Sequence, residues 1–303
     1  MLSAGTLTYL RGIAIIAMYN SIIVVGLSVF TGFTGLMSLG HAAFVAVGAY
    51  TCAIVTKLYG LPFIVGVILA GLVAGLYSLI IGIPTLRAKL RSDYFTIATL
   101  GFGEATRVLL ENLPITNGAR GLGGLGNYSK FWTVLVILVI VVFITKNYIF
   151  SRYGRMSIAV REDFTAAEMT GVNLFQVRLR ALFYSAVCAG IGGAMFAHYI
   201  RFIQPNMFTG VQSTLYLASV VAGGMGSITG PIIASVVFAV VPEVLRVAEM
   251  WRLVAYGALL VAIMVFRPSG ILGYKELTFR GIRNFFRKLG GKKPIGPNGE
   301  VQE

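Results

Sequence analysis

The sequence predicts an all-α polytopic membrane protein, and three observations lead to this fold class. Of the 303 residues, 57% are hydrophobic and only 12% are charged, about half the charged fraction of a typical soluble domain. The mean hydropathy is +0.83. The charged residues cluster between long apolar runs, and each run approaches the ~20 residues that a helix needs to cross a bilayer.

The apolar runs predict about 8–9 transmembrane helices, some of them broken by Gly-rich turns. The candidate spans are residues 8–30, 35–56, 61–82, 94–112, 130–148, 177–199, 211–226, 229–248 and 251–267. The first run is expected to be a retained span rather than a signal peptide, because Arg11 lies inside it and no A-x-A pattern follows. Residues 1–267 would form the transmembrane domain, and residues 268–303 a basic C-terminal tail.

The net charge of +14 is concentrated in a few loops. Lys and Arg gather at residues 87–91, 146–180 and 267–293, and the positive-inside rule makes such segments, including the C-terminus, cytoplasmic. Residues 113–129 and 200–210 then face outward, and counting backward places the N-terminus outside as well. The basic charge therefore indicates orientation and contact with anionic lipid rather than nucleic-acid binding.

Two segments share a cluster of Gly and Ser before an apolar helix: "TGLMSLGHAAFVAVGAY" (34–50) and "GGMGSITGPIIASVVFAV" (223–240). Interrupted helices at corresponding positions of two halves are typical of a transporter's central site. The same glycines could instead be helix-packing positions, as the pairs Gly71/Gly75 and Gly226/Gly230 indicate. If the first interpretation holds, the candidates for a solute path include Ser38, Gly40, His41 and Ser227.

Four more polar residues inside predicted spans are candidates for the same path: Thr96, Thr99, Glu104 and Gln212. An ionisable side chain costs ~3 kcal/mol in a membrane unless it is paired or wetted. Glu104 is three residues from Arg107, and Glu111 lies one turn further, so these charges can pair on one helix face. The cluster either lines the path or is a self-neutralising structural pair.

Cys52, Cys188, His41 and His198 are isolated from one another in the sequence. The two cysteines lie inside apolar segments, which favours small buried side chains over a disulfide or a metal pair. The sequence therefore predicts no metal site and no bound cofactor.

A charged loop at residues 149–176 separates two apolar runs. Arg155 to Thr170 contains no Pro or Gly, and this predicts one helix. Its apolar stripe comprises Met156, Val160, Phe164, Ala167 and Gly171. Such a helix should lie in the cytoplasmic plane and end at Gly171 and Asn173. It could dock a partner or be a solvated amphipathic connector.

The chain resembles the permeases of ABC importers in several motifs. "GRMSIAVREDFTAAEMTGVNLFQVRLRALFYSAVCAGIGGAMFA" resembles their cytoplasmic coupling loop and the following span. "DYFTIATLGFGEATRVLL", "TNGARGLGGL" and the two Gly-Ser segments also resemble family motifs, in the expected order between residues 26 and 272. Within this group the chain is similar to the M-type permease of the branched-chain amino acid transporter family.

The resemblance implies that the charged loop docks on an ATP-binding subunit. The residues placed there are Arg155, Arg161, Glu162, Phe164, Ala167, Glu168 and Gly171. This chain reads Ala166-Ala167-Glu168 where the family has Glu-Ala-Ala, so individual contacts are only loosely assigned. The outward loop with Asn117, Gly118, Arg120 and Gly121 could meet an external binding protein or simply cap the bundle.

The resemblance also implies a set of partners and a location. The partners are a second, related permease subunit, two ATP-binding subunits and an extracytoplasmic binding protein; the location is the plasma (inner) membrane of a bacterium or archaeon. The chain has no G-x-x-x-x-G-K-[ST] phosphate loop, so ATP hydrolysis is expected in a separate subunit and no enzymatic activity in this one.

The implied solute is a branched-chain or related small amino acid. One alternative is an ABC permease for urea or short amides. Another is a self-sufficient secondary transporter driven by H⁺ or Na⁺, for which Glu104 would be the coupling carboxylate.

Overall fold

The structure is a computed structural model that describes residues 4–244 and the single positions 257, 258, 261, 265, 270 and 273. The predicted span 251–267 and the tail 268–303 lie, apart from those positions, outside the described residues. The described part is mostly helical, in agreement with the predicted fold class.

Four helices in the described part are long and apolar enough to cross a membrane: Thr8–Gly32, Phe63–Arg87, Phe131–Phe150 and Leu174–Ile200. They correspond to α1 (Ala4–Leu27) with the π-helical turn η1 (Ser28–Gly32), α3 (Phe63–Arg87), α5 (Phe131–Phe150) and α8 (Leu174–Ile200). Each lies on a predicted span. The total of 8–9 spans stays a prediction.

Four other helices lie on the remaining predicted runs of the described part: α2 (His41–Lys57), α4 (Ser92–Asn112), α9 (Gly210–Gly223) and α10 (Thr229–Val244). The predicted span 35–56 is too long, because residues 35–40 are not helical and α2 begins at His41. The span 211–226 is likewise too long, because α9 ends at Gly223. Both Gly-Ser segments therefore break a helix, as the sequence predicts for a chain with interrupted helices.

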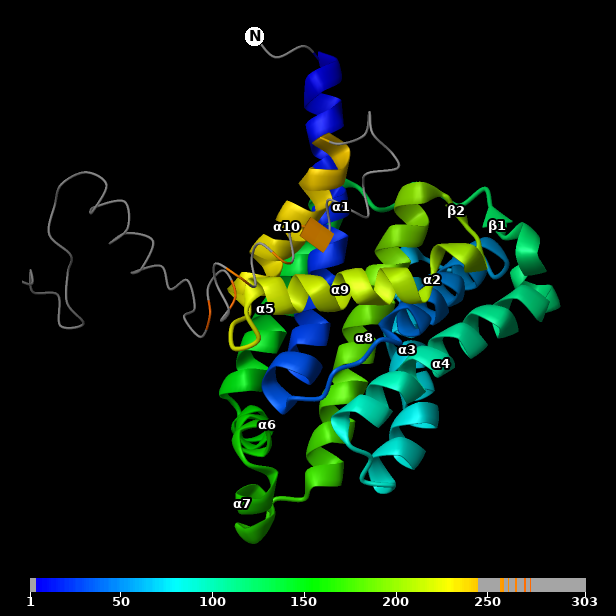
Figure 1. The fold of residues 1–303 in the computed structure, drawn as a ribbon. Helices are drawn as coiled ribbons and strands as arrows, with labels where there is room; N and C mark the ends of the chain where they lie inside the picture. Colours follow the sequence, from blue (N-terminus) through cyan, green and yellow to red (C-terminus); the bar gives the residue numbers. More distant parts are fainter. Residues whose placement is uncertain are drawn as a thin grey trace, which may run out of the picture.

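Short elements lie at the two ends of the long helices. One group comprises η2 (Pro114–Thr116), η3 (Gly118–Arg120), β1 (Leu122–Gly123), β2 (Phe202–Ile203) and η4 (Pro205–Met207). The other comprises α6 (Arg152–Glu162) and α7 (Phe164–Met169). β1 and β2 pair antiparallel, with Leu122 opposite Ile203. In Figure 1 this pair and the α6–α7 segment lie at opposite ends of the molecule, while α9 runs across the long helices. We call these the β end and the α6–α7 end.

The start of α1 lies at the β end. Tyr199, near the end of α8, donates a hydrogen bond from its hydroxyl to the carbonyl oxygen of Gly12 over 3.3 Å. The N-terminal part of α1 is therefore on the same side as the 113–129 loop and opposite the charged loop. This is the relative arrangement that counting the spans predicts.

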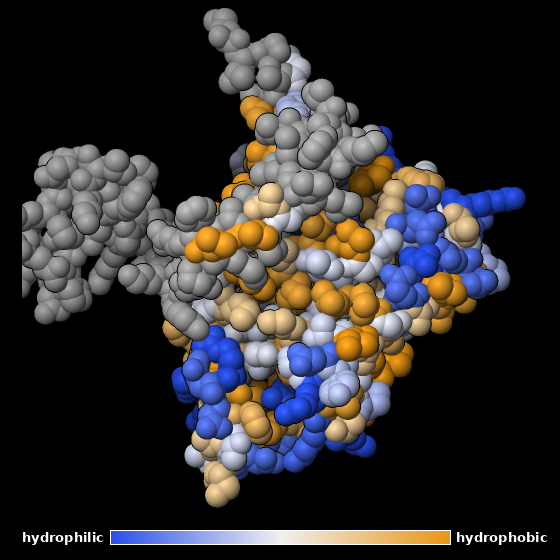
Figure 2. Space-filling model, viewed as in Figure 1, coloured by the Kyte–Doolittle hydropathy of each residue, from blue (hydrophilic) through white to orange (hydrophobic). Residues whose placement is uncertain are grey.

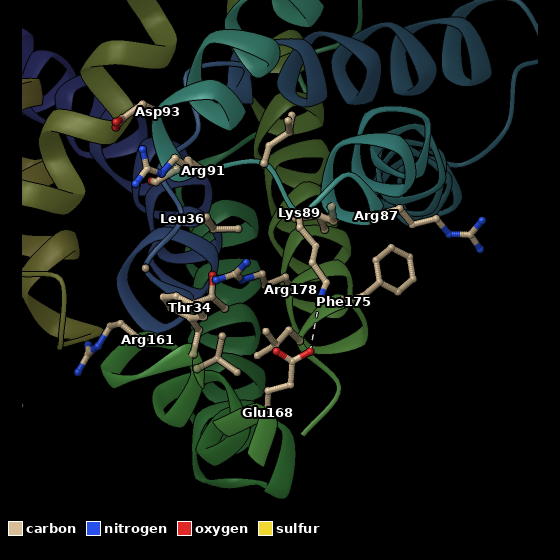
Figure 3. A pocket seen from close by; sticks show the side chains of 17 residues that line it. Thr34, Leu36, Arg87, Lys89, Arg91, Asp93, Arg161, Glu168, Phe175 and Arg178 are labelled. Atoms are coloured by element: carbon tan, nitrogen blue, oxygen red, sulfur yellow. Dashed lines mark hydrogen bonds and ion pairs between the residues drawn. The ribbon is translucent and has the colours of Figure 1, made fainter. Parts of the chain in front are cut away.

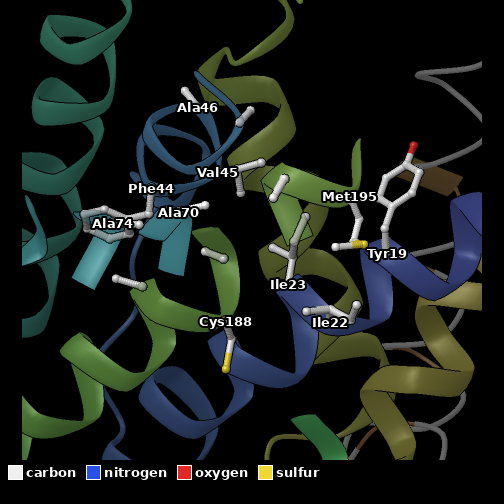
Figure 4. Close-up of a cluster of buried hydrophobic side chains, with 14 of the residues drawn as sticks. Tyr19, Ile22, Ile23, Phe44, Val45, Ala46, Ala70, Ala74, Cys188 and Met195 are labelled. Carbon is white, nitrogen blue, oxygen red and sulfur yellow. The ribbon is translucent and has the colours of Figure 1, made fainter. Parts of the chain in front are cut away.

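Helix α8 is the centre of the bundle and packs against α1, α2 and α3. Glycines allow these helices to approach closely: a Cβ on Gly48 would overlap Gly190, and one on Gly75 would lie 2.8 Å from Val187. The pair Gly71/Gly75 is thus a packing position on α3. Figure 4 shows the apolar side chains that fill this core, among them Ile22 and Met195.

The outer faces of α3 and α5 carry exposed apolar side chains, including Ile64, Ile68, Trp132, Val139 and Phe143. A helix that faces lipid needs apolar side chains on its outer face, because these side chains contact hydrocarbon. Its backbone groups are already paired within the helix. In Figure 2 apolar residues fill the middle of the visible face, and hydrophilic residues gather toward both ends. Cys52 and Cys188 are buried and free, as predicted.

Candidate functional site

The first break, residues 35–40, lies between the end of α1 and the start of α2. Its unwound backbone is held by two threonines of α4. Thr96 donates from its hydroxyl to the carbonyl of Met37 over 3.1 Å, and the Leu39 N–H donates to Thr99 Oγ1 over 3.2 Å. A Cβ on Gly40 would overlap the carbonyl oxygen of Thr99, so only glycine allows this approach. The structure thus joins these path candidates into one cluster and engages both hydroxyls with backbone.

His41 begins α2 and is completely buried. Its Nδ1 lies 3.1 Å from Ser38 Oγ, and its Nε2 lies 2.7 Å from Ser185 Oγ on α8. The ring stacks on Phe30 and meets the edge of Phe44. Both ring nitrogens therefore have partners, which a buried imidazole requires, and the residue fastens the start of α2 to the central helix.

Two partners of this cluster are not predicted from the sequence. Ser185 holds His41, and Ser213 of α9 accepts a 2.9 Å hydrogen bond from the Ala42 N–H, one of the free donors at the start of α2. Both serines are buried small polar residues in apolar helices, which is the only sequence signal that could have found them. Gln212, the neighbouring candidate, is half-buried in the first turn of α9.

The second break, residues 224–228, separates α9 from α10. Gly224 has a φ of +113°, which only glycine adopts without strain. Ser227 caps α10, since its Oγ accepts from the Gly230 N–H over 3.2 Å. A Cβ on Gly223 would overlap the backbone of Gly230, so the two helices meet backbone to backbone. Both interpretations of the glycines apply here: Gly224 interrupts the helix, and Gly223 allows close packing of α9 against α10.

Glu104, Arg107 and Glu111 form the predicted charge cluster on α4. Arg107 Nε lies 2.8 Å from Glu104 Oε2, and its Nη1 lies 2.7 Å from Glu111 Oε1. Arg107 also donates to Asn206 Oδ1 over 2.9 Å. The second oxygen of Glu104 accepts from the Gly210 N–H over 3.1 Å, at the start of α9. The cluster therefore ties α4 to the beginning of α9.

The charged loop forms two helices, so the prediction of one helix from Arg155 to Thr170 is wrong. Asp163 has an extended backbone, and its Oδ1 accepts from the N–H groups of Thr165 and Ala166 over 2.8 and 3.0 Å. This N-cap ends α6 and starts α7, because a capping residue leaves the helical conformation. Gly171, with a φ of +84°, ends α7 as predicted.

The single apolar stripe is also divided by this cap. Val160 and Ala167 are buried with Val177 of α8, and this small cluster anchors both helices. Met156 and Phe164 are instead exposed, at 37% and 58%. Because Asp163 changes the direction of the chain, the predicted stripe does not run along one face.

The remaining docking candidates take different positions on this loop. Arg155 is exposed and donates to the Phe150 carbonyl over 3.1 Å. Glu168 pairs with Lys89 of the α3–α4 connection over 3.4 Å, and both side chains are more than half exposed. Arg161 points inward: its Nη1 donates to the Gly32 carbonyl over 2.9 Å, and only 17% of the side chain is exposed.

A cavity of about 900 Å³ opens at the α6–α7 end, between α6–α7, the α3–α4 connection and the start of α8. Figure 3 shows its basic side chains, and the residues that carry charge are Arg87, Lys89, Arg91, Asp93, Arg161, Glu168 and Arg178. Five of these seven side chains are positively charged and two are negatively charged. Phe164 and Phe175 contribute apolar surface.

The Gly-rich loop at the β end is held by its own backbone. Asn117 adopts a left-handed conformation and donates from Nδ2 to the Gly121 carbonyl over 2.9 Å. A Cβ on Gly121 would overlap the carbonyl of Ile203 in β2. Gly118 has a φ of +58°, and Arg120 is exposed. Asn117 and Gly121 therefore stabilise the loop and its contact with β2, and Arg120 is a charged side chain that the loop exposes.

Long apolar helices, a helix break in each half and a charged helix pair at one end define a polytopic α-helical membrane protein of the transporter type. Residues 9–266 match the family described as the permease component of branched-chain amino acid transport systems. The chain belongs to this family of permeases.

The chain is similar to several curated permeases, including the following three. The chain is 34% identical to the high-affinity branched-chain amino acid transport system permease protein LivM of Escherichia coli K12, over 90% of this chain and 71% of the relative. It is 23% identical to a probable LivM of Methanocaldococcus jannaschii, over 82% and 81%. The autoinducer 2 import system permease protein LsrC of Escherichia coli is 26% identical over 73% and 70%. No solved structure gave a significant match.

Proposed function

We propose that this chain forms the translocation path of an ATP-driven importer, together with a second, related permease subunit. Two ATP-binding subunits would drive it, and an extracytoplasmic binding protein would deliver the solute. The solute we propose is a branched-chain or related small amino acid. Family membership and the similarity to LivM over nine-tenths of the chain support this assignment.

The α7 surface is the observation that carries the docking part of the proposal. Phe164 and Met169 are 58% and 86% exposed at the polar end of the molecule, where lipid tails do not account for exposed apolar side chains. Val160 and Ala167 anchor the same segment against Val177 of α8. An anchored element with exposed apolar and charged side chains is suited to a protein partner. The positive charge of the surrounding loops orients this end toward the cytoplasm.

The proposed membrane is the plasma membrane of a bacterium or archaeon, with the C-terminus on the cytoplasmic side. Arg87, Lys89 and Arg91 at the α3–α4 connection lie at the same end as α6–α7, so the basic loops agree on one orientation. The opposite end, with the Gly-rich loop, would then meet the binding protein, and Arg120 is an exposed charge of that loop.

The test is co-purification from native membranes in mild detergent. We expect an ATP-binding subunit to accompany the native chain and to be lost from Glu168→Arg and Gly171→Trp. The Glu168 pair with Lys89 is exposed, so its loss has little effect on folding. The matched control is Arg120→Glu, a charge reversal at the opposite end, which should retain the subunit. If no ATP-binding subunit follows the native chain, the proposal fails.

The solute is tested separately, by uptake of labelled leucine into vesicles that contain the complete system. Competition by isoleucine and valine supports the proposed class, whereas competition by urea or acetamide alone supports the short-amide alternative. A secondary transporter is disfavoured, because the coupling carboxylate it would need, Glu104, already holds Arg107 and the Gly210 N–H.

A further inference from the structure

Arg161 links the charged loop to the first helix break. Its guanidinium reaches from α6 to the carbonyl oxygen of Gly32, 129 residues earlier in the chain, at the end of the π-helical turn that closes α1. Carbonyls at the end of a helix lack an intrahelical partner, and a cation there also meets the negative end of the helix dipole. Arg161 therefore caps the first membrane-crossing helix from outside the bundle.

The same side chain lies against the start of the first break. Gly35 has a φ of +77°, and a Cβ at this position would lie 3.2 Å from Arg161 Cγ. The apolar stem of Arg161 thus covers the turn at which the chain leaves α1. The guanidinium and the stem together hold the Gly32 carbonyl near the end of the helix and the first residue of the break.

A residue of the second break also contacts Gly32. A Cβ on Gly32 would overlap the carbonyl oxygen of Met225 and would lie 3.2 Å from its carbonyl carbon. Met225 belongs to residues 224–228, between α9 and α10. Arg161 therefore contacts Gly32 and Gly35, and Gly32 in turn contacts Met225. We call these four residues the junction, because they link α6 through Gly32 to the breaks of both halves.

Arg161 also has a connection toward the surface. Its Nε donates to Glu162 Oε1 over 3.1 Å, and Nη2 pairs with the same oxygen. The Glu162 side chain is 66% exposed, whereas that of Arg161 is 17% exposed. One guanidinium thus bridges an exposed carboxylate on the charged loop and a buried helix end.

We propose that Arg161 is a positioning residue that transmits movement of the charged loop to the two helix breaks. This inference rests on the proposed function, because it takes an ATP-binding subunit to move α6 and α7. A planar guanidinium with several donors suits the role, since it can keep both oxygen partners while its neighbours shift. The role differs from docking: Arg161 faces the bundle, and the docking surface lies on α7.

The experiment separates docking from transmission in the assembled complex. A reporter cysteine replaces Met37, which is 40% exposed in the first break, and its labelling by a water-soluble maleimide is followed with and without ATP and vanadate. The native Cys52 and Cys188 are buried. Co-purification of the ATP-binding subunit and ATP hydrolysis are measured on the same samples.

In the otherwise native chain we expect ATP and vanadate to change the labelling rate. In Arg161→Met, which keeps the stem but removes the donors, the subunit should remain bound and hydrolyse ATP. The nucleotide-dependent change in the labelling rate should fall to about a tenth of its value in the native chain, equivalent to about 1.4 kcal/mol of coupling free energy. Arg161→Lys should restore part of it, because an ammonium can reach one oxygen but lacks the fork that holds two.

One further variant excludes a general effect of changing α6, and a second tests the junction from the side of Gly32. Arg152→Met is the matched control, because Arg152 is exposed in the first turn of the same helix; it should behave as the native chain. Gly32→Ala perturbs the junction from the other side with Arg161 intact, and it should reproduce the loss seen in Arg161→Met.

Three outcomes would overturn the inference. An unchanged nucleotide response in Arg161→Met would show that the bond to Gly32 transmits nothing. Loss of the ATP-binding subunit from Arg161→Met alone would make Arg161 a docking contact. Absence of that subunit from the native chain would refute the proposed function, and the inference with it.

Discussion

Gly32 and Met225 lie in backbone contact, although 193 positions separate them in the chain: a Cβ on Gly32 would overlap the carbonyl oxygen of Met225. Gly32 ends the π-helical turn after α1, and Met225 lies in the break between α9 and α10. The two breaks are thus neighbours at the end of the bundle near α6. This contact brings the two halves of the chain together where Arg161 reaches them.

Gly32→Ala should destabilise the protein, because the added methyl group has no space. Forcing a methyl group into a packed backbone contact costs about 1–3 kcal/mol, and we expect a lower melting temperature of the detergent-solubilised protein. Gly101→Ala is the matched control: it lies in α4 with no atom within 4 Å of its Cβ position. Equal melting temperatures for both variants would contradict the packing assigned to Gly32.

His41→Phe should destabilise the protein despite keeping a ring in place. Phe cannot bond Ser38 or Ser185, which would lose their His41 partner inside the bundle, and a buried polar group left unpaired costs about 1–3 kcal/mol. The double variant His41→Phe with Ser185→Ala should recover part of the loss, because it removes one of the stranded hydroxyls. Thermal unfolding of the two variants measures this, and no recovery would indicate that ring packing alone matters.

Asp163→Ala should loosen α7 without unfolding the bundle. The Asp163 carboxylate accepts from two N–H groups at the start of α7, and the loss of such a cap costs about 0.5–2 kcal/mol. Hydrogen exchange should become faster at residues 164–169 and stay unchanged in α8. Asp163→Asn should keep most of the protection, because Asn also caps well. Faster exchange throughout the protein would refute the local role.

Glu104→Gln should leave uptake dependent on ATP and insensitive to a proton gradient. The amide oxygen of Gln can still accept from the Gly210 N–H, and Arg107 keeps Glu111 as a partner, so the link between α4 and α9 should survive. Uptake is measured in vesicles with ATP held constant, with and without an uncoupler. Collapse of uptake on addition of the uncoupler would favour the secondary-transporter alternative.

Several features of the site could be predicted because they depend on residues close together in the chain. Glu104, Arg107 and Glu111 pair as their spacing predicts, and Gly171 ends a helix because it tolerates a positive φ. The first helix break, at residues 35–40, agrees with the Gly-Ser segment that begins at residue 34. The division of the charged loop at Asp163 was missed: the periodicity of its apolar residues favoured one helix, whereas the capping preference of Asp prevailed.

The sequence by itself determined the membrane class, the positions of the apolar runs, the two breaks and the charged loop, because composition and short-range periodicity express them directly. Only the tertiary structure decided which groups meet across the bundle: Ser185 with His41, Ser213 with Ala42, and Arg161 with Gly32. These partners are more than 100 residues apart. These contacts depend on how the glycine-lined helices pack around α8, and that packing geometry cannot be predicted from a local sequence pattern.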